Sequence, residues 1–168
     1  MPRKLLKKVL PTHEKIKEQR FLKIFGSFLH RRELWRLSRK KVITGVFIGI
    51  FVAALPMPLQ MVLTATLAII FSANLPISFV LIFISNPLTM PPLFFLEYKI
   101  GNFFLRPENP IEFNFESMYD NFGQIALSLW SGALILGVVC ATICAITLNY
   151  LWIYSVRKNR KASQFNKI

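Results

Sequence analysis

The chain contains two long apolar stretches that are separated and flanked by polar residues. The first runs from Val42 to Leu105 and is interrupted by prolines, and the second runs unbroken from about Ile125 to Tyr154. No Asp, Glu, Lys, Arg or His occurs over residues 42–96, a run of 55 residues, whereas a soluble segment of that length would have a charged, solvated face. The pattern predicts an all-α integral membrane protein.

The second stretch predicts one transmembrane helix over residues 125–154. Trp130 lies near one end, and Tyr150, Trp152 and Tyr154 cluster at the other, as aromatic residues do at the two membrane interfaces. The 22 residues from Trp130 to Trp152 make about 33 Å of helix, which matches a hydrocarbon core of ~30 Å. We therefore expect a single crossing here.

The first stretch, residues 42–105, is cut into short pieces by prolines. Each of the pieces 42–55, 59–73 and 93–105 would be a helix of about 20 Å, too short to span the membrane alone. Two arrangements remain open: continuous spans kinked by proline, or half-helices that enter and leave as re-entrant hairpins. The expected fold is a small helical bundle of proline-broken half-helices plus one long transmembrane helix. The prolines that divide the stretch are Pro56, Pro58, Pro76, Pro87, Pro91 and Pro92.

Two proline-rich tips are the candidate site. In each tip a proline suits the first turn of the following helix, and polar side chains lie close by. We expect free N–H groups at the helix starts, which would suit an anionic or polar group. Asn74, between apolar pieces, is expected to be a turn residue. The candidate substrate-facing residues are Pro58, Gln60, Asn86, Pro87, Thr89 and Pro91.

Charge gives the topology. Lys and Arg exceed acids by 13 in the whole chain, and residues 1–41 hold 14 of them against three Glu. Residues 155–168 are basic, while residues 106–124 carry four acids against one Arg. By the positive-inside rule both termini are cytoplasmic and residues 106–124 form an external loop. Residues 42–105 must then cross an odd number of times, in a multi-pass protein.

The basic segment, residues 1–41, has apolar residues at roughly helical spacing among its Lys and Arg. It predicts an amphipathic helix that binds anionic headgroups of the inner leaflet, with a solvated topology signal as the open alternative. Nucleic-acid binding is not expected, because no nucleic-acid motif accompanies the charge. Composition agrees with a membrane chain, at 54% hydrophobic residues and a mean hydropathy of +0.46.

Small residues predict helix packing. Gly45, Gly49 and Ala53 lie four apart, as do Ala133, Gly137 and Ala141, so each set forms a ridge that a second helix can approach closely. We expect the two ridges to meet within one bundle or across a homo-oligomer. The open alternative is that small residues are simply common in membrane helices.

Glu97 is the one acid close to the apolar region. An intramembrane carboxylate suggests a proton-coupling site, although Glu97 also lies near the polar loop and has Lys99 and Arg106 as potential partners. Cys140 and Cys144 are interpreted as packing residues. We expect no metal, cofactor or disulfide.

A family resemblance rests on a run of motifs in the first two thirds of the chain. The chain resembles the DUF2062 family of bacterial membrane proteins, and the Asn-Pro-Leu-Thr motif is its most specific part. The resemblance implies a bacterial inner-membrane location, and it brings no established activity and no catalytic residues. The matching residues are Gly45, Gly49, Pro58, Gln60, Asn74, residues 86–92, Tyr98 and Gly101, with a similar basic segment opening on Met1 to Lys4.

The sequence leaves two candidate functions open and argues against a third. The first is a transporter or flippase-like protein for an anionic or lipid-linked substrate, with the two tips facing the substrate. The second is a non-catalytic membrane scaffold or assembly subunit. An enzyme is not expected, because the sequence contains no H-E-x-x-H, no G-x-S-x-G and no paired intramembrane carboxylates.

Overall fold

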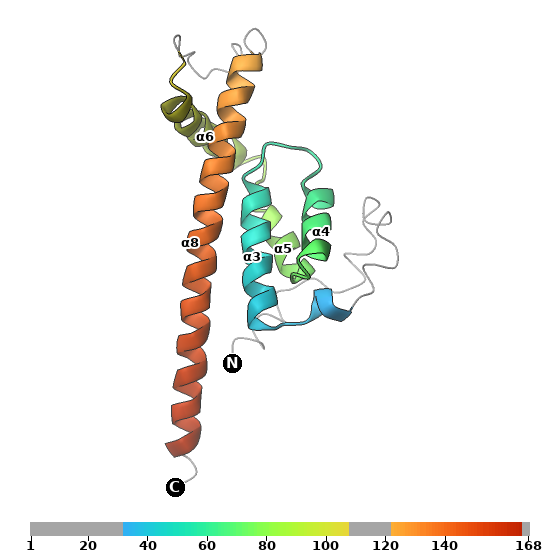
Figure 1. Cartoon of the computed structure of the whole chain (residues 1–168), viewed down its shortest axis with the longest axis vertical. Helices are drawn as coiled ribbons and strands as arrows, with labels where there is room; N and C mark the ends of the chain where they lie inside the picture. The colour runs from blue at the N-terminus through green and yellow to red at the C-terminus, as the bar shows by residue number, and fades with distance from the viewer. Residues whose placement is uncertain (1–31, 108–121, 166–168) are drawn as a thin grey trace.

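The computed structural model of the chain describes residues 32–107 and 122–165, and every regular element in this part is helical (Figure 1). The prediction of an all-α fold is confirmed for these residues. A short 3-10 turn comes first, followed by five α-helices. The elements are η2 (Arg32–Trp35), α3 (Arg39–Ala53), α4 (Gln60–Ile70), α5 (Leu75–Ile82), α6 (Met90–Leu105) and α8 (Phe122–Phe165).

Helix α8 is the longest element, and α6 and α3 pack along it. Its 44 residues make a rod of about 66 Å at the rise of an α-helix. Within it, Ile125–Lys158 is long and apolar enough to cross a membrane. The helix extends beyond the predicted residues 125–154 at both ends, because no proline or glycine follows Tyr154 to end it.

Helices α3, α4 and α5 form a small bundle beside α8 (Figure 1). Helices α3 and α4 lie side by side and are joined by the Pro56–Pro58 turn. Helix α5 is the centre of the bundle, since residues 73–79 are all buried, and this is why its sequence carries no polar face. The core of the bundle is made of Leu34, Ile48, Val52, Ala65, Ala68, Ala73, Leu75, Phe79 and Ile82.

The break between α4 and α5 is made by Ser72 and Asn74. Ser72 takes a left-handed conformation with φ of 48°, and Asn74 caps α5 by accepting a hydrogen bond from the N–H of Ile77 at 3.2 Å. Pro76 lies in the first turn of α5, where its missing N–H costs no helical hydrogen bond. The predicted division of the region next to Pro76 is confirmed, because α4 ends at Ile70 and α5 begins at Leu75, and the prediction of a turn at Asn74 is confirmed as well.

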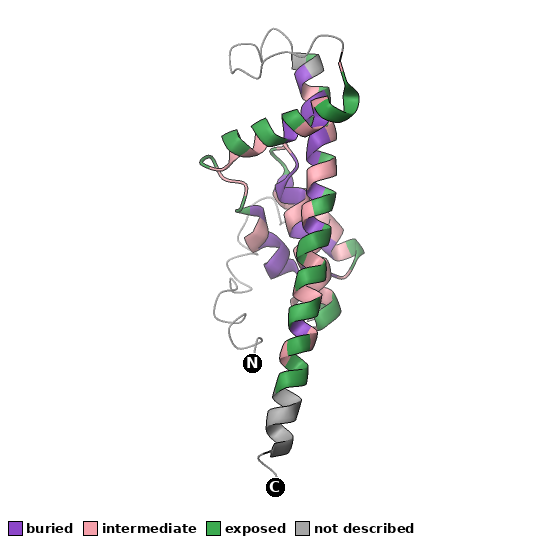
Figure 2. Cartoon of the chain, turned by 90° about the vertical axis from the view of Figure 1, so that its left-hand side faces the viewer, coloured by how far each residue is buried: buried purple, intermediate pink, exposed green. Residues whose placement is uncertain are grey.

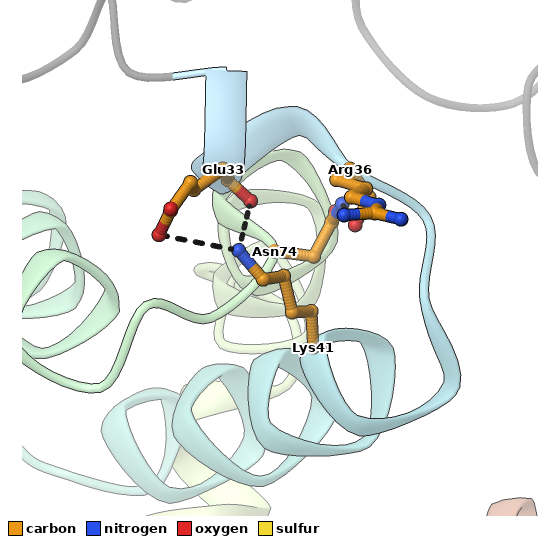
Figure 3. Close-up of polar contacts among 4 residues, drawn as sticks. All are labelled: Glu33, Arg36, Lys41 and Asn74. Carbon is orange, nitrogen blue, oxygen red and sulfur yellow. Dashed lines mark hydrogen bonds and ion pairs between the residues drawn. The ribbon is translucent and has the colours of Figure 1, made fainter.

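Asn74 also ties the start of α3 to the start of α5 (Figure 3). Its side-chain amide donates to the carbonyl of Arg36 at 3.3 Å, and its backbone N–H donates to the carbonyl of Lys41 at 2.9 Å. Lys41 in turn donates to the carbonyl of Glu33 at 2.9 Å and lies 3.6 Å from its carboxylate. These contacts hold residues 33–41 against the bundle.

The predicted amphipathic segment lies mostly outside the described residues. Residues 1–31 belong to it but are not described, and in the remainder Leu34 is 2% exposed and packs inside the bundle. Helix α3 begins at Arg39, within the segment predicted to end at residue 41. Helix α3 therefore crosses the predicted boundary between the basic segment, which ends at residue 41, and the membrane region, which begins at residue 42.

Candidate functional site

Helix α6 crosses α8 near one end of the molecule, and the two backbones touch at a pair of glycines (Figures 1 and 2). A Cβ atom at Gly101 would overlap the carbonyl oxygen of Ser128, and one at Gly132 would overlap the carbonyl oxygen of Glu97. No residue other than glycine fits at either position without moving a helix. The crossing therefore fixes Glu97 directly against α8.

Glu97 is completely buried at this crossing, with an exposed fraction of 0%. Neither of its carboxylate oxygens has a hydrogen-bond partner in the described part of the chain. Lys99 is exposed and lies 4.6 Å from the centre of the Phe95 ring, and neither Lys99 nor Arg106 forms an ion pair in the described part of the chain. The Lys99 and Arg106 partnerships considered from the sequence are therefore not formed.

The apolar surroundings of Glu97 make its charge expensive. Residues 125–136 of α8 contain no charged side chain, and the nearby core is made of Tyr98, Ile125 and Leu129 with Phe94 against it. Burying an unpaired charge costs far more free energy than burying a neutral group. A carboxyl group in this place can hold a proton while the crossing is closed, and it can keep a negative charge only if the crossing opens to water or to a cation.

The first tip, Pro56 to Gln60, uses its polar side chain to close its own turn. The amide of Gln60 is 9% exposed and donates to the carbonyl of Leu55 at 2.7 Å. Beside it lies a cavity of about 250 Å³. The cavity is lined by Pro58, Leu59, Gln60, Met61 and Val62 from the first tip and by Ile82, Phe83 and Ser85, which lead into the second. The two tips thus lie at the same end of the bundle.

The second tip is a compact turn in which Asn86 and Thr89 satisfy each other's backbone. The side-chain carbonyl of Asn86 accepts hydrogen bonds from the N–H groups of Leu88 and Thr89 at 2.9 and 3.1 Å. The Thr89 hydroxyl accepts from the N–H of Asn86 at 3.0 Å and donates to the carbonyl of Ile84 at 2.6 Å. This bonding gives the Asn-Pro-Leu-Thr motif a structural reason that needs no ligand.

The prediction of free N–H groups at this tip is wrong. The N–H of Met90 donates to the carbonyl of Asn86 at 2.8 Å, and that of Leu93 donates to the carbonyl of Thr89 at 3.1 Å. Pro91 and Pro92, which lie between them, have no N–H to offer. The start of α6 therefore presents no unpaired backbone donor, and a substrate-facing role for Pro87, Thr89 and Pro91 remains a prediction.

The α8 ridge packs against α3, the helix expected, whereas the glycines of the α3 ridge pack against α5 instead of α8. Cβ atoms at Gly45 and Gly49 would each lie 2.8 Å from a backbone oxygen of α5 or its cap, those of Asn74 and Ser78. A Cβ at Gly137 would lie 3.2 Å from the side chain of Ala54 at the end of α3. The glycines of the α3 ridge thus face α5, and Gly137 of the α8 ridge faces Phe51 and Ala54 on another side of α3. The glycines of the two ridges do not contact each other. Ala53, Ala133 and Ala141 are buried as well.

Sequence reasoning missed Ser128 and Gly132. These two residues lie four apart on α8 and form the surface that receives Gly101, so their spacing was the available signal. It was overlooked because Ala133, next to Gly132, belongs to a longer and more regular series. Two further buried oxygens without partners, Thr64 Oγ1 and Asn102 Oδ1, had no signal in the sequence.

The described residues hold no group of three His, Cys, Asp or Glu side chains that could bind a metal ion. Cys140 is half-buried and Cys144 is exposed on α8, and both are free thiols.

Comparison with known proteins places the chain in a family. Residues 22–161 match the family described as "Uncharacterized protein conserved in bacteria (DUF2062)". The match continues past Gly101, where the resemblance in the sequence ended, and includes the α6–α8 crossing and most of α8. No curated protein and no solved structure matches. Since the match covers most of its 168 residues, the chain belongs to the DUF2062 family of bacterial proteins.

Proposed function

We propose that this protein is an integral membrane protein of the bacterial inner membrane that moves an anionic or lipid-linked substrate, with Glu97 as its proton-coupling carboxylate. The observation that carries the proposal is the complete burial of Glu97 at the α6–α8 crossing, where no described residue pairs with its carboxylate. An intramembrane carboxylate of this kind is costly, and such groups are typical of proton pathways.

Membrane placement is supported by the apolar surface of α8 and α6. Large apolar side chains on several sides of α8 have no protein to cover them, and a bilayer would cover them at no cost (Figure 2). The same holds for Phe103 and Phe104 on α6, at 70% and 61% exposed. The exposed apolar residues of α8 include Leu127, Leu134, Val138, Val139, Ile143 and Ile146.

The depth of each helix follows from its contacts along α8. The start of α3, at Arg39, lies beside Asn149 and Trp152, and α6 lies against Gly132. Twenty residues of helix separate Gly132 from Trp152, or about 30 Å, which equals the ~30 Å thickness of a hydrocarbon core. This spacing supports α6 at the external interface and Arg39 at the cytoplasmic one, with α3 and α4 as a re-entrant hairpin between them.

Movement of α6 would couple the proton to transport. When Glu97 carries a proton, the crossing is neutral and stays closed on the glycine contact. When Glu97 loses the proton, its charge faces no cation on residues 125–136 of α8, and α6 must separate from α8 for the carboxylate to reach water. Because residues 83–89 connect α6 to the bundle, this movement would pull on the cavity between the two tips.

The scaffold function is the second candidate, and a specific observation supports it. The polar side chains of Gln60, Asn86 and Thr89 all bond to the backbone of their own turns. A tip whose hydrogen bonds are satisfied has less to offer a substrate. In this alternative, the rigid turns shape a surface for a partner, and the unpaired carboxyl of Glu97 has no catalytic use.

The discriminating experiment compares lipid extracts of wild-type bacteria with those of cells lacking the protein. Transport predicts that the deletion accumulates a specific anionic or lipid-linked species, that wild-type protein and Glu97→Asp reverse the accumulation, and that Glu97→Gln does not. Lys99→Gln, which changes an exposed neighbour, is the matched control and should restore wild-type extracts. Accumulation that Glu97→Gln reverses fully would contradict the coupling role, and unchanged extracts in the deletion would favour the scaffold.

Water access to the tips gives a second test. In protein lacking Cys140 and Cys144, single cysteines at Met57 and Leu88 should react with a membrane-impermeant thiol reagent if the tips line a transport path. A cysteine at Val139, on the exposed apolar face of α8, is the control and should stay unlabelled. If neither cysteine reacts with the reagent added from either side of the membrane, the proposal that the tips face the substrate is contradicted.

A further inference from the structure

We propose that the start of α3 and the second half of α8 form a binding site for the headgroup of an anionic phospholipid in the cytoplasmic leaflet. Arg39 and Lys40 belong to the basic segment, residues 1–41, and the site adds to its predicted action a specific place for one headgroup, between two packed helices. It rests on the membrane placement given above. Its residues are Arg39, Lys40, Thr44, Asn149, Trp152 and Arg157.

Two adjoining grooves make the site. One, of about 370 Å³, is lined by Arg39, Lys40, Ile43 and Thr44 of α3 and by Ala145, Ile146 and Asn149 of α8. The other, of about 360 Å³, is lined by Arg39, Trp152, Ile153, Val156 and Arg157. Arg39 lines both grooves, so a ligand in either one meets its guanidinium group.

The positive charge of the grooves is not neutralised by any residue in the described ranges, 32–107 and 122–165. Arg39, Lys40 and Arg157 form no ion pair in the described part of the chain, where Glu33 is paired with Lys41. Figure 3 shows Lys41 turned toward Glu33. Two charged residues of the first turn of α3 thus remain available, together with one from α8. An anion is the complementary ligand.

The rest of the lining distinguishes a lipid from a small anion. Each groove continues from its basic residues onto apolar ones, Ile43 and Ile146 in the first and Ile153 and Val156 in the second. A free phosphate would have no use for this apolar floor, whereas a phospholipid would lay its glycerol and upper acyl chain along it. Trp152, 9% exposed, lies at the level expected for an interfacial aromatic. Basic pockets between helices on the cytoplasmic side suit anionic headgroups.

The test measures lipid preference at Trp152. The full chain, with Trp35 and Trp130 replaced by Phe, is reconstituted into bilayers of brominated phosphatidylglycerol or brominated phosphatidylcholine, and quenching of Trp152 gives the relative affinity. The site predicts a preference for phosphatidylglycerol of roughly fivefold for each basic residue that contacts the headgroup. Arg39→Gln and Arg157→Gln should each lower the preference by about that factor, and circular dichroism should show unchanged helix content. Lys99→Gln removes the same charge from α6, which the proposed placement puts at the external interface, and should keep the preference.

Other outcomes would overturn the proposal. An equal loss in Lys99→Gln would assign the preference to net charge, and release of the preference by inorganic phosphate in the buffer would assign the groove to a free anion. Quenching without preference in the unaltered site would exclude a headgroup site while leaving the membrane placement intact. No quenching by either lipid would contradict the membrane placement itself, and the site with it.

Discussion

Asn74 and Glu97 are both polar residues with 0% exposure, and the regions around them differ in one respect. Asn74, in the α3–α5 bundle, uses its side chain both to cap α5 and to hold the carbonyl of Arg36. Glu97, at the α6–α8 crossing, has no partner for either carboxylate oxygen among the residues that the structure describes. A buried polar group stabilises a fold only when it is hydrogen-bonded. Asn74 therefore stabilises the fold. Glu97 lowers the stability of the fold, so its presence requires a reason other than stability.

The largest effect should come from breaking the crossing itself. Gly132→Ala places a Cβ into the carbonyl of Glu97, and we expect a loss of at least about 3 kcal/mol in the free energy of unfolding, because backbone cannot move aside as a side chain can. Unfolding by a denaturing detergent in mixed micelles measures the loss. Gly123→Ala, where nothing lies within 4 Å, is the control and should lose nothing. Equal stability of the two variants would mean that α6 and α8 do not touch as described.

A smaller loss should follow in the bundle. Asn74→Ala removes the cap of α5 and leaves the carbonyl of Arg36 without its donor, so we expect a loss of about 2 kcal/mol. Asn149→Ala is the matched control, because Asn149 forms no side-chain hydrogen bond in the described part of the chain. The same unfolding measurement compares them, and an unchanged midpoint for Asn74→Ala would remove one side of the comparison.

The smallest effect should have the opposite sign. The Thr64 hydroxyl is fully buried in α4 without a partner, so Thr64→Val should raise the free energy of unfolding by about 1 kcal/mol. Thr66→Val is the control, since the Thr66 hydroxyl donates to the carbonyl of Val62 at 2.8 Å and its removal gives no such gain. A loss of stability in Thr64→Val would indicate a hidden partner and weaken the same reasoning at Glu97.

The features that could be predicted from the sequence were those that depend on residues close together along the chain. The run without charge, the aromatic ends of the second apolar stretch and the Pro56–Pro58 break all act within a few residues, and helices α8, α3 and α4 follow from them. Asn74 was recognised as a turn residue for the same reason. The break next to Pro76 was predicted on the same basis, because proline suits the first turn of a helix and often lies where a new helix starts.

The features that it did not predict depend on contacts between distant segments. Gly132 and Gly101 are 31 positions apart, and only the crossing of their helices makes them a pair. Glu97 stood out as the one acid near the apolar region, but its burial depends on the uncharged stretch of α8 that covers it. The hydrogen bonds within the Asn86–Thr89 turn were not predicted, because Asn and Thr are common both as capping residues and as ligand-binding residues.

The most direct test of the account is the stability of Glu97→Met, measured beside the wild-type protein in mixed micelles. Met has nearly the same shape as Glu and needs no hydrogen bond, so the account predicts that the variant is more stable by about 1–3 kcal/mol and that it fails to replace the wild-type protein in cells. A variant that is less stable, by an amount similar to the loss in Asn74→Ala, would contradict it. That result would mean that the Glu97 carboxyl has a stabilising partner.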